Sequence, residues 1–220
     1  MSLPRVYPIV DSAEWVRRLL AVGVRLVQLR IKDRPTEELR TEIRTARALC
    51  ARAGARLIVN DYWQLAIAED CEFVHLGQGD LDGADTRAIR GAGMRLGVST
   101  HDERELERAL ALAPDYVALG PVYPTLLKVM PWAPQGLERL REWKRRIGHI
   151  PLVAIGGLTV ERLAGVFAAG ADAAAVVTDI VRHPDPEARA RAWLAAAEES
   201  SAPGEALRAA SRVGLGSSVP

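Results

Sequence analysis

The sequence predicts a single-domain α/β fold, the closed (β/α)8 TIM barrel, and three observations support this prediction. Short apolar runs of strand length alternate with longer stretches whose apolar residues recur at helical spacing. The chain has 220 residues, 49% of them hydrophobic, which suits one domain with a substantial core. Pairs such as Ala53-Gly54 and Ala169-Gly170 precede predicted strands, where glycine supplies the left-handed conformation that ends a helix.

The predicted elements alternate along the chain. The strands are expected at Val6–Val10, Leu26–Arg30, Arg56–Asn60, Phe73–Leu76, Arg95–Ser99, Tyr116–Leu119, Pro151–Ile155 and Ala173–Val177. The helices are expected at Glu14–Ala21, Thr36–Arg52, Trp63–Ala68, Asp85–Arg90, Asp102–Leu112, Leu137–Ile147, Val160–Ala169 and Pro186–Glu199. Eight strands, each followed by a helix, favour a closed parallel barrel, and an open doubly wound sheet is the alternative. The barrel is expected over residues 1–199, and residues 200–220 are expected to form a flexible or weakly ordered tail because they are rich in Ser, Gly, Ala and Pro.

Composition limits the classes of partner. Lys and Arg together number 29 and Asp and Glu 28, so the chain lacks the basic excess of a general nucleic-acid binder. No long apolar run predicts a membrane span, and the beginning of the chain has no pattern of a signal peptide. Cys50 and Cys71 lack metal-ligand spacing, so reduced thiols and a cytoplasmic location are expected. Small-molecule substrates are the expected partners, and a homo-oligomer is left open.

The end of the second predicted strand carries polar side chains on one face. Strand alternation places Gln28, Arg30 and Lys32 together, facing the mouth of the barrel, where barrel enzymes carry their active sites. Two cations and an amide suit a polyanion attached to a polar ring. Solvated charges at an exposed strand end are the alternative.

Two acidic side chains lie at the ends of the next two strands. Asp61 follows the third strand and Asp80 follows the fourth. Two carboxylates beside a diphosphate are a usual way to hold Mg²⁺, which keeps several waters and also binds phosphate oxygens. Capping of the Trp63 helix by Asp61 is the alternative. Metal binding is favoured because the cationic side chains lie next door.

The fifth and sixth strands add a hydroxyl and a lysine. Ser99 could donate to a phosphate or cap the following helix, and His101 is interpreted as a turn residue. The connection over residues 120–136 is long and rich in proline, which is typical of an active-site lid. Lys128 within it could bring a third cation to the anion.

The last two strands end in a different kind of anion site. Gly156-Gly157 follows the seventh strand, and Val177 and Thr178 follow the eighth. Backbone amides at these positions form the usual phosphate cradle of phosphate-binding barrels. Two anion sites imply two phosphorylated reactants, or one molecule with a phosphate at each end.

Taken in order, these segments resemble those of the thiamine-phosphate synthase family. The matching segments are Tyr7-Pro8-Ile9-Val10-Asp11, Gln28 to Lys32, Asn60-Asp61-Tyr62-Trp63, His75-Leu76-Gly77-Gln78 with Asp80, Gly97-Val98-Ser99-Thr100-His101, Ala118-Leu119-Gly120, Pro124-Thr125 with Lys128, Ala133-Pro134-Gln135-Gly136 and Ala154-Ile155-Gly156-Gly157. The resemblance covers roughly residues 5 to 195, and the ordered series is specific where each motif alone is not.

The resemblance implies a Mg²⁺-dependent transferase that joins an aminopyrimidine methyl diphosphate to a thiazole phosphate and releases diphosphate. It implies that Asp61 and Asp80 hold the metal. Arg30, Lys32, Ser99 and Lys128 would be the catalytic residues. The implied pyrimidine-diphosphate ligands are Gln28, Leu29, Arg30, Ile31, Lys32, Asn60, Ser99 and Lys128, and the implied thiazole-phosphate ligands are Thr125, Leu126, Leu127, Gly157, Val177 and Thr178.

Three positions depart from the family pattern. Leu127 stands where the family usually has a threonine, Thr178 stands for the usual serine, and Gly79 replaces a commonly acidic residue. A lost hydrogen bond to a charged group costs on the order of 1.5–3 kcal/mol, so Leu127 is expected to weaken thiazole-phosphate binding without abolishing catalysis.

Two rival functions come from the same barrel family, and a third is an unrelated phosphate-binding barrel. A thiazole tautomerase lacks the complete pyrimidine-diphosphate set and uses a histidine after strand six, where this chain has Pro121 after Gly120. A non-catalytic barrel that binds a thiamine precursor is compatible with Leu127. Pro121 and the intact set of cations and aspartates favour the synthase over the tautomerase, and magnesium-dependent release of diphosphate would separate it from the non-catalytic barrel. An unrelated barrel would not predict the ordered motifs.

Overall fold

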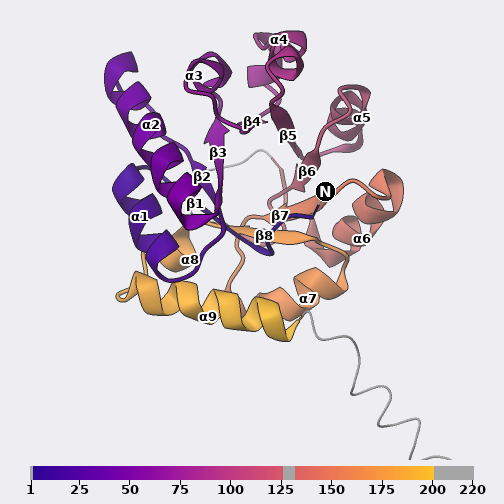
Figure 1. Ribbon diagram of the computed structural model, residues 1–220. Helices are drawn as coiled ribbons and strands as arrows, with labels where there is room; N and C mark the ends of the chain where they lie inside the picture. Colours follow the sequence, from indigo (N-terminus) through magenta and orange to yellow (C-terminus); the bar gives the residue numbers. More distant parts are fainter. Residues whose placement is uncertain (1, 126–131, 201–220) are drawn as a thin grey trace, which may run out of the picture.

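The structure is a computed structural model that describes residues 2–125 and 132–200. Its strands form a closed parallel barrel in sequence order, and the last strand pairs with the first through Val6 opposite Ala174. The strands are β1 (Val6–Val10), β2 (Leu26–Leu29), β3 (Arg56–Asn60), β4 (Phe73–Leu76), β5 (Arg95–Thr100), β6 (Tyr116–Leu119), β7 (Leu152–Ile155) and β8 (Ala173–Val176). The predicted single-domain TIM barrel is confirmed, and the open doubly wound sheet is excluded by the pairing of β8 with β1 (Figure 1).

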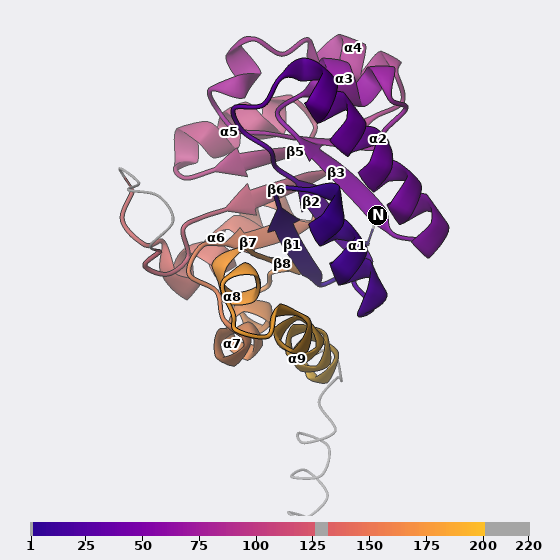
Figure 2. The same ribbon diagram turned by 90° about the vertical axis from the view of Figure 1, so that its left-hand side faces the viewer.

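Helices surround the barrel, as Figures 1 and 2 show. They are α1 (Ala13–Ala21), α2 (Thr36–Ala53), α3 (Trp63–Ala68), α4 (Thr86–Gly91), α5 (Glu103–Ala111), α6 (Gly136–Ile147), α7 (Leu163–Ala168), α8 (Thr178–Val181) and α9 (Pro186–Glu199), with short 3-10 helices η1 (Asp80–Asp82) and η2 (Val160–Arg162). The helix predicted over Val160–Ala169 is divided into η2 and α7, and α8 and η1 were not predicted. Both lie at strand ends and are too short to show helical periodicity.

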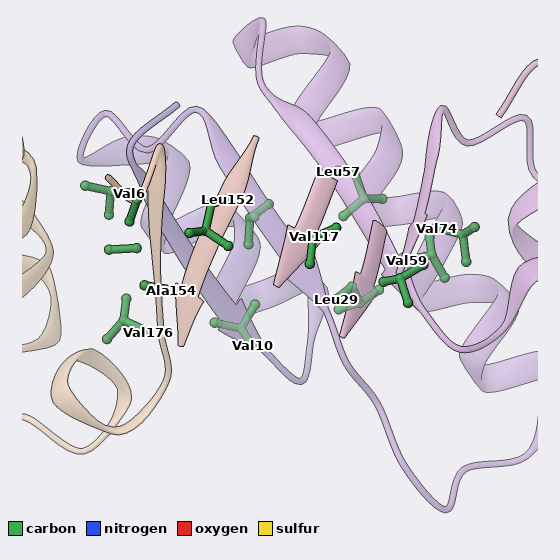
Figure 3. Close-up of a cluster of buried hydrophobic side chains, with 14 of the residues drawn as sticks. Val6, Val10, Leu29, Leu57, Val59, Val74, Val117, Leu152, Ala154 and Val176 are labelled. Carbon is green, nitrogen blue, oxygen red and sulfur yellow. The ribbon is translucent and has the colours of Figure 1, made fainter. Parts of the chain in front are cut away.

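The side chains of the strands divide between two cores because they alternate along each strand. One set points into the barrel and includes Tyr7, Phe73 and Tyr116, each at most 1% exposed. The other set points outward against the helices, and Figure 3 shows part of it, including Val10, Leu29, Leu57 and Val117. Helices therefore cover the outside of the barrel while the interior is filled by side chains, so the open strand ends are left to bind ligands.

Capping residues fix where several helices begin, which in turn fixes the turns that follow the strands. Ser12 caps α1 by accepting from Trp15 N at 3.3 Å, and Asp102 caps α5 by accepting from Glu105 N at 2.8 Å. Asp185 caps α9, whose first residue is Pro186. Gly54 ends α2 in the left-handed conformation, as predicted from the sequence.

No helix in the described part of the chain is both long enough and apolar enough to cross a bilayer. Cys50 and Cys71 are free and buried, and burial raises the pKa of their thiols to about 12 and about 11. Both thiols therefore stay protonated and pack as small apolar groups near neutral pH. The tail predicted from residue 200 lies outside the described residues from 201 onward.

Candidate active site

Two cavities open at the carboxyl ends of the strands, and they share part of their lining. The polar cavity, of about 470 Å³, is lined by Asp11, Gln28, Arg30, Asn60, His75 and Ser99 among others. The glycine cavity, of about 230 Å³, is lined by His101, Thr125, Gly156, Gly157, Val177 and Thr178 among others. Arg30, Ser99, Ile155 and Val177 line both. The two cavities are therefore neighbouring halves of one site that meet at a guanidinium and a hydroxyl.

The polar cavity presents amides and a cation to a ligand. Gln28 and Asn60 are at most 5% exposed and come from the neighbouring strands β2 and β3. The Asn60 side chain makes no hydrogen bond with any other described residue. The backbone N–H of Arg30 donates to the Val10 carbonyl at 2.7 Å, but the Arg30 guanidinium makes no hydrogen bond or ion pair with any described residue. The amide of Asn60 and the guanidinium of Arg30 are thus available to a polar ring and to an anion.

Next to this cavity, one lysine and two aspartates form the cluster Lys32, Asp61 and Asp80. Lys32 Nζ donates to Asp61 Oδ2. Partial burial raises the pKa of the Asp80 carboxyl, and the Asp61 carboxylate beside it raises this pKa further. Lys32 acts in the opposite direction, so part of the shift reflects repulsion between two neighbouring carboxylates.

The cluster fits a divalent cation better than it fits helix capping. Tyr62, and not Asp61, is the residue before α3, and α3 has no side-chain cap. Among the described residues no group of three or more His, Cys, Asp or Glu side chains converges, so the chain offers two carboxylates here. Mg²⁺ takes one or two carboxylates and completes its coordination with waters and phosphate oxygens, which matches this donor set.

Backbone conformation also favours an aspartate at position 61. Asp61 has a φ of 65°, in the left-handed region that aspartate and asparagine tolerate better than other residues with side chains. Its backbone N–H donates to the carbonyl of His75 at 2.9 Å, which ties the end of β3 to β4. The turn therefore sets the position of the Asp61 carboxylate beside Asp80.

The glycine pair after β7 fits closely against the segment that follows β6. Gly156 and Gly157 have φ values of 96° and 65°. A Cβ on Gly157 would lie 2.4 Å from the carbonyl oxygen of Pro124, and one on Gly156 would lie 2.7 Å from Pro121 Cα. Tyr123 N donates to the Gly156 carbonyl at 3.0 Å. Only glycine fits both positions, and the backbone is exposed to the cavity.

A chain of buried hydrogen bonds crosses the barrel interior and ends at Ser99. Gln28 Nε2 donates to Tyr7 Oη at 2.7 Å, and the hydroxyls of Tyr7 and Tyr116 lie 2.9 Å apart. His75 Nδ1 lies 2.8 Å from Tyr116 Oη, and His75 Nε2 lies 2.8 Å from Ser99 Oγ. Ser99 does not cap α5, because Asp102 does.

Burial keeps the interior members of this chain uncharged. It lowers the pKa of His75 to about 4 and raises the pKa of both tyrosines above the ordinary value. Tyr7, His75 and Tyr116 were not assigned a role from the sequence. Strand alternation could have placed them in the barrel interior. His75, for example, lies on the same face of β4 as the interior residue Phe73.

His101 is more than a turn residue. Its Nδ1 lies 2.7 Å from Glu105 Oε2, and its backbone N–H donates to the same oxygen at 2.8 Å. The indole of Trp132 stacks on the imidazole, with ring centroids 4.0 Å apart. This contact joins the segment after β6 to the end of β5 at the edge of the glycine cavity.

The remaining predicted ligands are distributed unevenly. Leu29 and Ile31 are each 2% exposed and belong to the outer core, so only their backbone could reach a ligand in the mouth. Thr125, Val177 and Thr178 line the glycine cavity together with Gly157. Leu126, Leu127 and Lys128 lie outside the described residues.

Comparison with known proteins decides which family these features belong to. The family model for thiamine monophosphate synthase matches residues 6–180, which includes both cavities except for Val181. The chain belongs to this family. The resemblance found in the sequence is thereby confirmed, and the site of this thiamine monophosphate synthase family member lies where barrel enzymes bind their substrates.

Similar proteins carry the same name. A thiamine-phosphate synthase of Rhizobium etli is 67% identical over 196 residues, covering 89% of this chain and 96% of the relative. One from Cronobacter sakazakii is 54% identical over 180 residues, covering 82% and 86%. The solved structure of a thiamine phosphate pyrophosphorylase from Pyrococcus furiosus superposes with a TM-score of 0.80 at 28% identity, covering 89% of this chain and 96% of that one.

Proposed function

We propose that this chain is a thiamine-phosphate synthase, which joins 4-amino-2-methyl-5-(diphosphooxymethyl)pyrimidine to thiazole phosphate and releases thiamine phosphate and diphosphate. Membership of the family and 67% identity to the Rhizobium etli synthase support this activity. The single structural observation that carries it is the pair of adjoining cavities that meet at Arg30 and Ser99. A reaction between two phosphorylated molecules needs two anion sites on either side of one reacting carbon.

The two halves of the site divide the substrates between them. The polar cavity would take the pyrimidine, with the amides of Gln28 and Asn60 next to the ring and the diphosphate directed toward Arg30 and Lys32. The glycine cavity would take the thiazole phosphate, held by backbone N–H groups at Gly157 and Thr178 and by the side chain of Thr125. In this arrangement the shared residues lie beside the bond that breaks and the bond that forms.

The proposed reaction requires stabilisation of the charge that develops on the leaving group, and it requires little proton transfer. The carbon–oxygen bond of the pyrimidine methylene breaks, and both electrons leave with the diphosphate. The electron-rich aminopyrimidine stabilises the methylene cation until the thiazole nitrogen donates its lone pair to form the carbon–nitrogen bond. Arg30 and Lys32 would stabilise charge on the leaving group, and Ser99 would add a hydrogen bond. This agrees with the lowered pKa of His75, the one histidine among the described residues that line the polar cavity.

Mg²⁺ is the proposed cofactor, and Asp61 and Asp80 would hold it. When bound, it would neutralise part of the diphosphate charge and so make the diphosphate a better leaving group. Lys32 donates to Asp61, so it would orient this carboxylate as well as reach the diphosphate. The raised pKa of Asp80 supports the proposal, because two close carboxylates favour a cation between them.

The test supplies the purified full chain with both substrates and Mg²⁺ and follows thiamine phosphate and diphosphate together. A synthase forms them in equal amounts, and removal of Mg²⁺ with a chelator stops both. A tautomerase would convert the thiazole phosphate without the pyrimidine diphosphate. A non-catalytic barrel would bind both molecules and release no diphosphate, and that result at saturating substrate would exclude the synthase. The cytoplasmic location and a homo-oligomer stay predictions.

A further inference from the structure

The hydrogen-bond chain that ends at Ser99 connects the floor of the site with its reacting centre. Its members are Gln28, Tyr7, Tyr116, His75 and Ser99, and they come from β2, β1, β6, β4 and β5. Four of them are at most 8% exposed, whereas Ser99 is half-buried and lines both cavities. Among the described residues, no fully buried side-chain nitrogen or oxygen lacks a hydrogen-bond partner. The network is therefore complete. Gln28 and His75 also line the polar cavity, and Ser99 is its one member that lines both cavities.

Ring packing holds this network in place. The imidazole of His75 stacks on the ring of Tyr116 at 5.6 Å with an interplanar angle of 13°, and the Tyr7 ring meets Tyr116 edge to face at 6.1 Å. Each of these rings can shift only if the barrel interior around it rearranges, because protein cores are close-packed. Packing thus fixes the ring nitrogens of His75 relative to Ser99.

One order of donors and acceptors uses the proton of every hydroxyl group inside the network. Gln28 Nε2 can only donate, so Tyr7 accepts from it, and in this order the Tyr7 hydroxyl donates to Tyr116. Tyr116 then donates to Nδ1 of the neutral imidazole, which leaves the imidazole proton on Nε2 to donate to Ser99 Oγ. Because Ser99 accepts this bond, its own hydroxyl proton is directed at the cavity.

We propose that the Gln28–Tyr7–Tyr116–His75 chain is a positioning device that keeps Ser99 as a hydrogen-bond donor to the departing diphosphate. An ionised phosphate oxygen can only accept a hydrogen bond. If the Ser99 hydroxyl donated to His75, only an oxygen lone pair would face the diphosphate. Ser99 keeps its proton throughout, and no bond to it forms or breaks. This inference rests on the proposed function for the reaction that it serves, whereas the proton order itself can be measured without substrates.

The first measurement therefore needs no turnover. The ¹⁵N chemical shifts of His75 in the full chain report which ring nitrogen carries the proton, and we expect the Nε2–H form. Tyr116→Phe removes the acceptor–donor hydroxyl and keeps the ring, and it should shift the tautomer population toward Nδ1–H or a mixture. A pure Nδ1–H form in the unmodified chain would overturn the proposal, because Ser99 would then donate into the network.

The second measurement is a double-mutant cycle on the condensation rate. Ser99→Ala should lower kcat by about a hundredfold, as loss of one donor to developing negative charge does. Tyr116→Phe should lower kcat by about tenfold with KM for the pyrimidine diphosphate within about twofold, because the substrate contacts remain. In the Ser99→Ala background, Tyr116→Phe should add less than about twofold, since both changes remove the same function. Losses that multiply would show that Tyr116 acts separately from Ser99.

The neighbouring residue provides a matched control on the opposite face of β5. Thr100 is fully buried, accepts from Trp143 Nε1 at 3.0 Å and donates to the Ala118 carbonyl at 3.0 Å. Thr100→Val removes a buried hydroxyl from the outer core, so it should lower stability while kcat stays within about twofold. An inactive unmodified chain would reject the proposed function. If the unmodified chain is active but the kcat losses of Ser99→Ala and Tyr116→Phe multiply in the double variant, only the positioning role is rejected.

Discussion

A methyl group on Gly97 would lie 2.0 Å from Cζ of Tyr116 and 2.4 Å from its hydroxyl. The two residues are opposite each other in the pairing of β5 with β6. The missing side chain at position 97 therefore creates the space in the barrel interior that the Tyr116 ring fills. Because Tyr116 contacts both Tyr7 and His75, this glycine supports the whole hydrogen-bonded interior.

Gly97→Ala should consequently destabilise the barrel. A methyl group at this position forces the Tyr116 ring out of a packed interior, and overpacking of this kind costs about 1–3 kcal/mol. Urea unfolding measures the change. Gly91→Ala is the control, because nothing lies within 4 Å of a Cβ at this position in α4. Equal stability for the two variants would contradict the close packing of Gly97 on Tyr116.

Asp61→Asn should separate metal binding from folding. Asparagine tolerates the left-handed φ of 65° at this turn, so the fold of this variant should stay intact. We expect the Mg²⁺ concentration for half-maximal activity to rise and kcat to fall by about a hundredfold, because one of two carboxylate ligands is lost.

The same substitution has a readout without metal. It removes the carboxylate that raises the pKa of Asp80, so the Asp80 pKa should fall when measured by NMR titration of the metal-free chain. Asp82→Asn is the control, since Asp82 is exposed and pairs with Arg108. Unchanged Mg²⁺ activation in Asp61→Asn would remove Asp61 from the proposed metal site.

The buried imidazole of His75 should make stability depend on pH. Burial lowers its pKa from about 6.5 to about 4, so the unfolded chain binds a proton at a pH where the folded chain does not. Stability should therefore be complete above pH 6.5 and decline as the pH falls toward 4. Between pH 7.5 and pH 5 the loss from this group is about 2 kcal/mol.

Urea unfolding at the two pH values measures this loss. His75→Gln keeps hydrogen-bonding capacity and removes the titrating group, so its stability should fall less over the same range. His149→Gln removes an exposed imidazole and should preserve the dependence of the unmodified chain. An identical pH dependence in His75→Gln would assign the loss to other groups.

Features set by neighbouring strands could be predicted from the sequence. Apolar runs gave the bounds of the strands to within one residue at each end, and Lys32 meets Asp61 because β2 and β3 are adjacent in a barrel. The sequence also placed the glycine pair directly after β7, whereas its close fit against the segment after β6 is seen only in the structure.

Features that depend on distant side chains could not be predicted. Tyr7 and Tyr116 are 109 residues apart, and their hydrogen bond depends on barrel closure and on the space left by Gly97. The short helix α8 has no periodicity to detect, since it spans only Thr178–Val181. Leu29 and Ile31 were grouped with polar neighbours in a motif, although strand alternation turns their side chains into the outer core.

Gly157→Ala should weaken the thiazole half of the site selectively. The substitution introduces a side chain at a φ of 65° and places its Cβ 2.4 Å from the Pro124 carbonyl oxygen, so the turn must move. Backbone amides hold a phosphate only when they point at it together, and we expect KM for thiazole phosphate to rise by about tenfold or more. KM for the pyrimidine diphosphate should change by less than about threefold, because Gly157 does not line the polar cavity.

Initial rates with each substrate varied in turn distinguish this outcome from a general loss of structure. Gly165→Ala is the control, because a Cβ there would meet Leu137 Cδ1 at 3.4 Å, an ordinary contact within the helical layer. Its two KM values should match those of the unmodified chain. If Gly157→Ala raised both KM values equally, the two cavities would act as one undivided site, and the assignment of the glycine cavity to thiazole phosphate would be wrong.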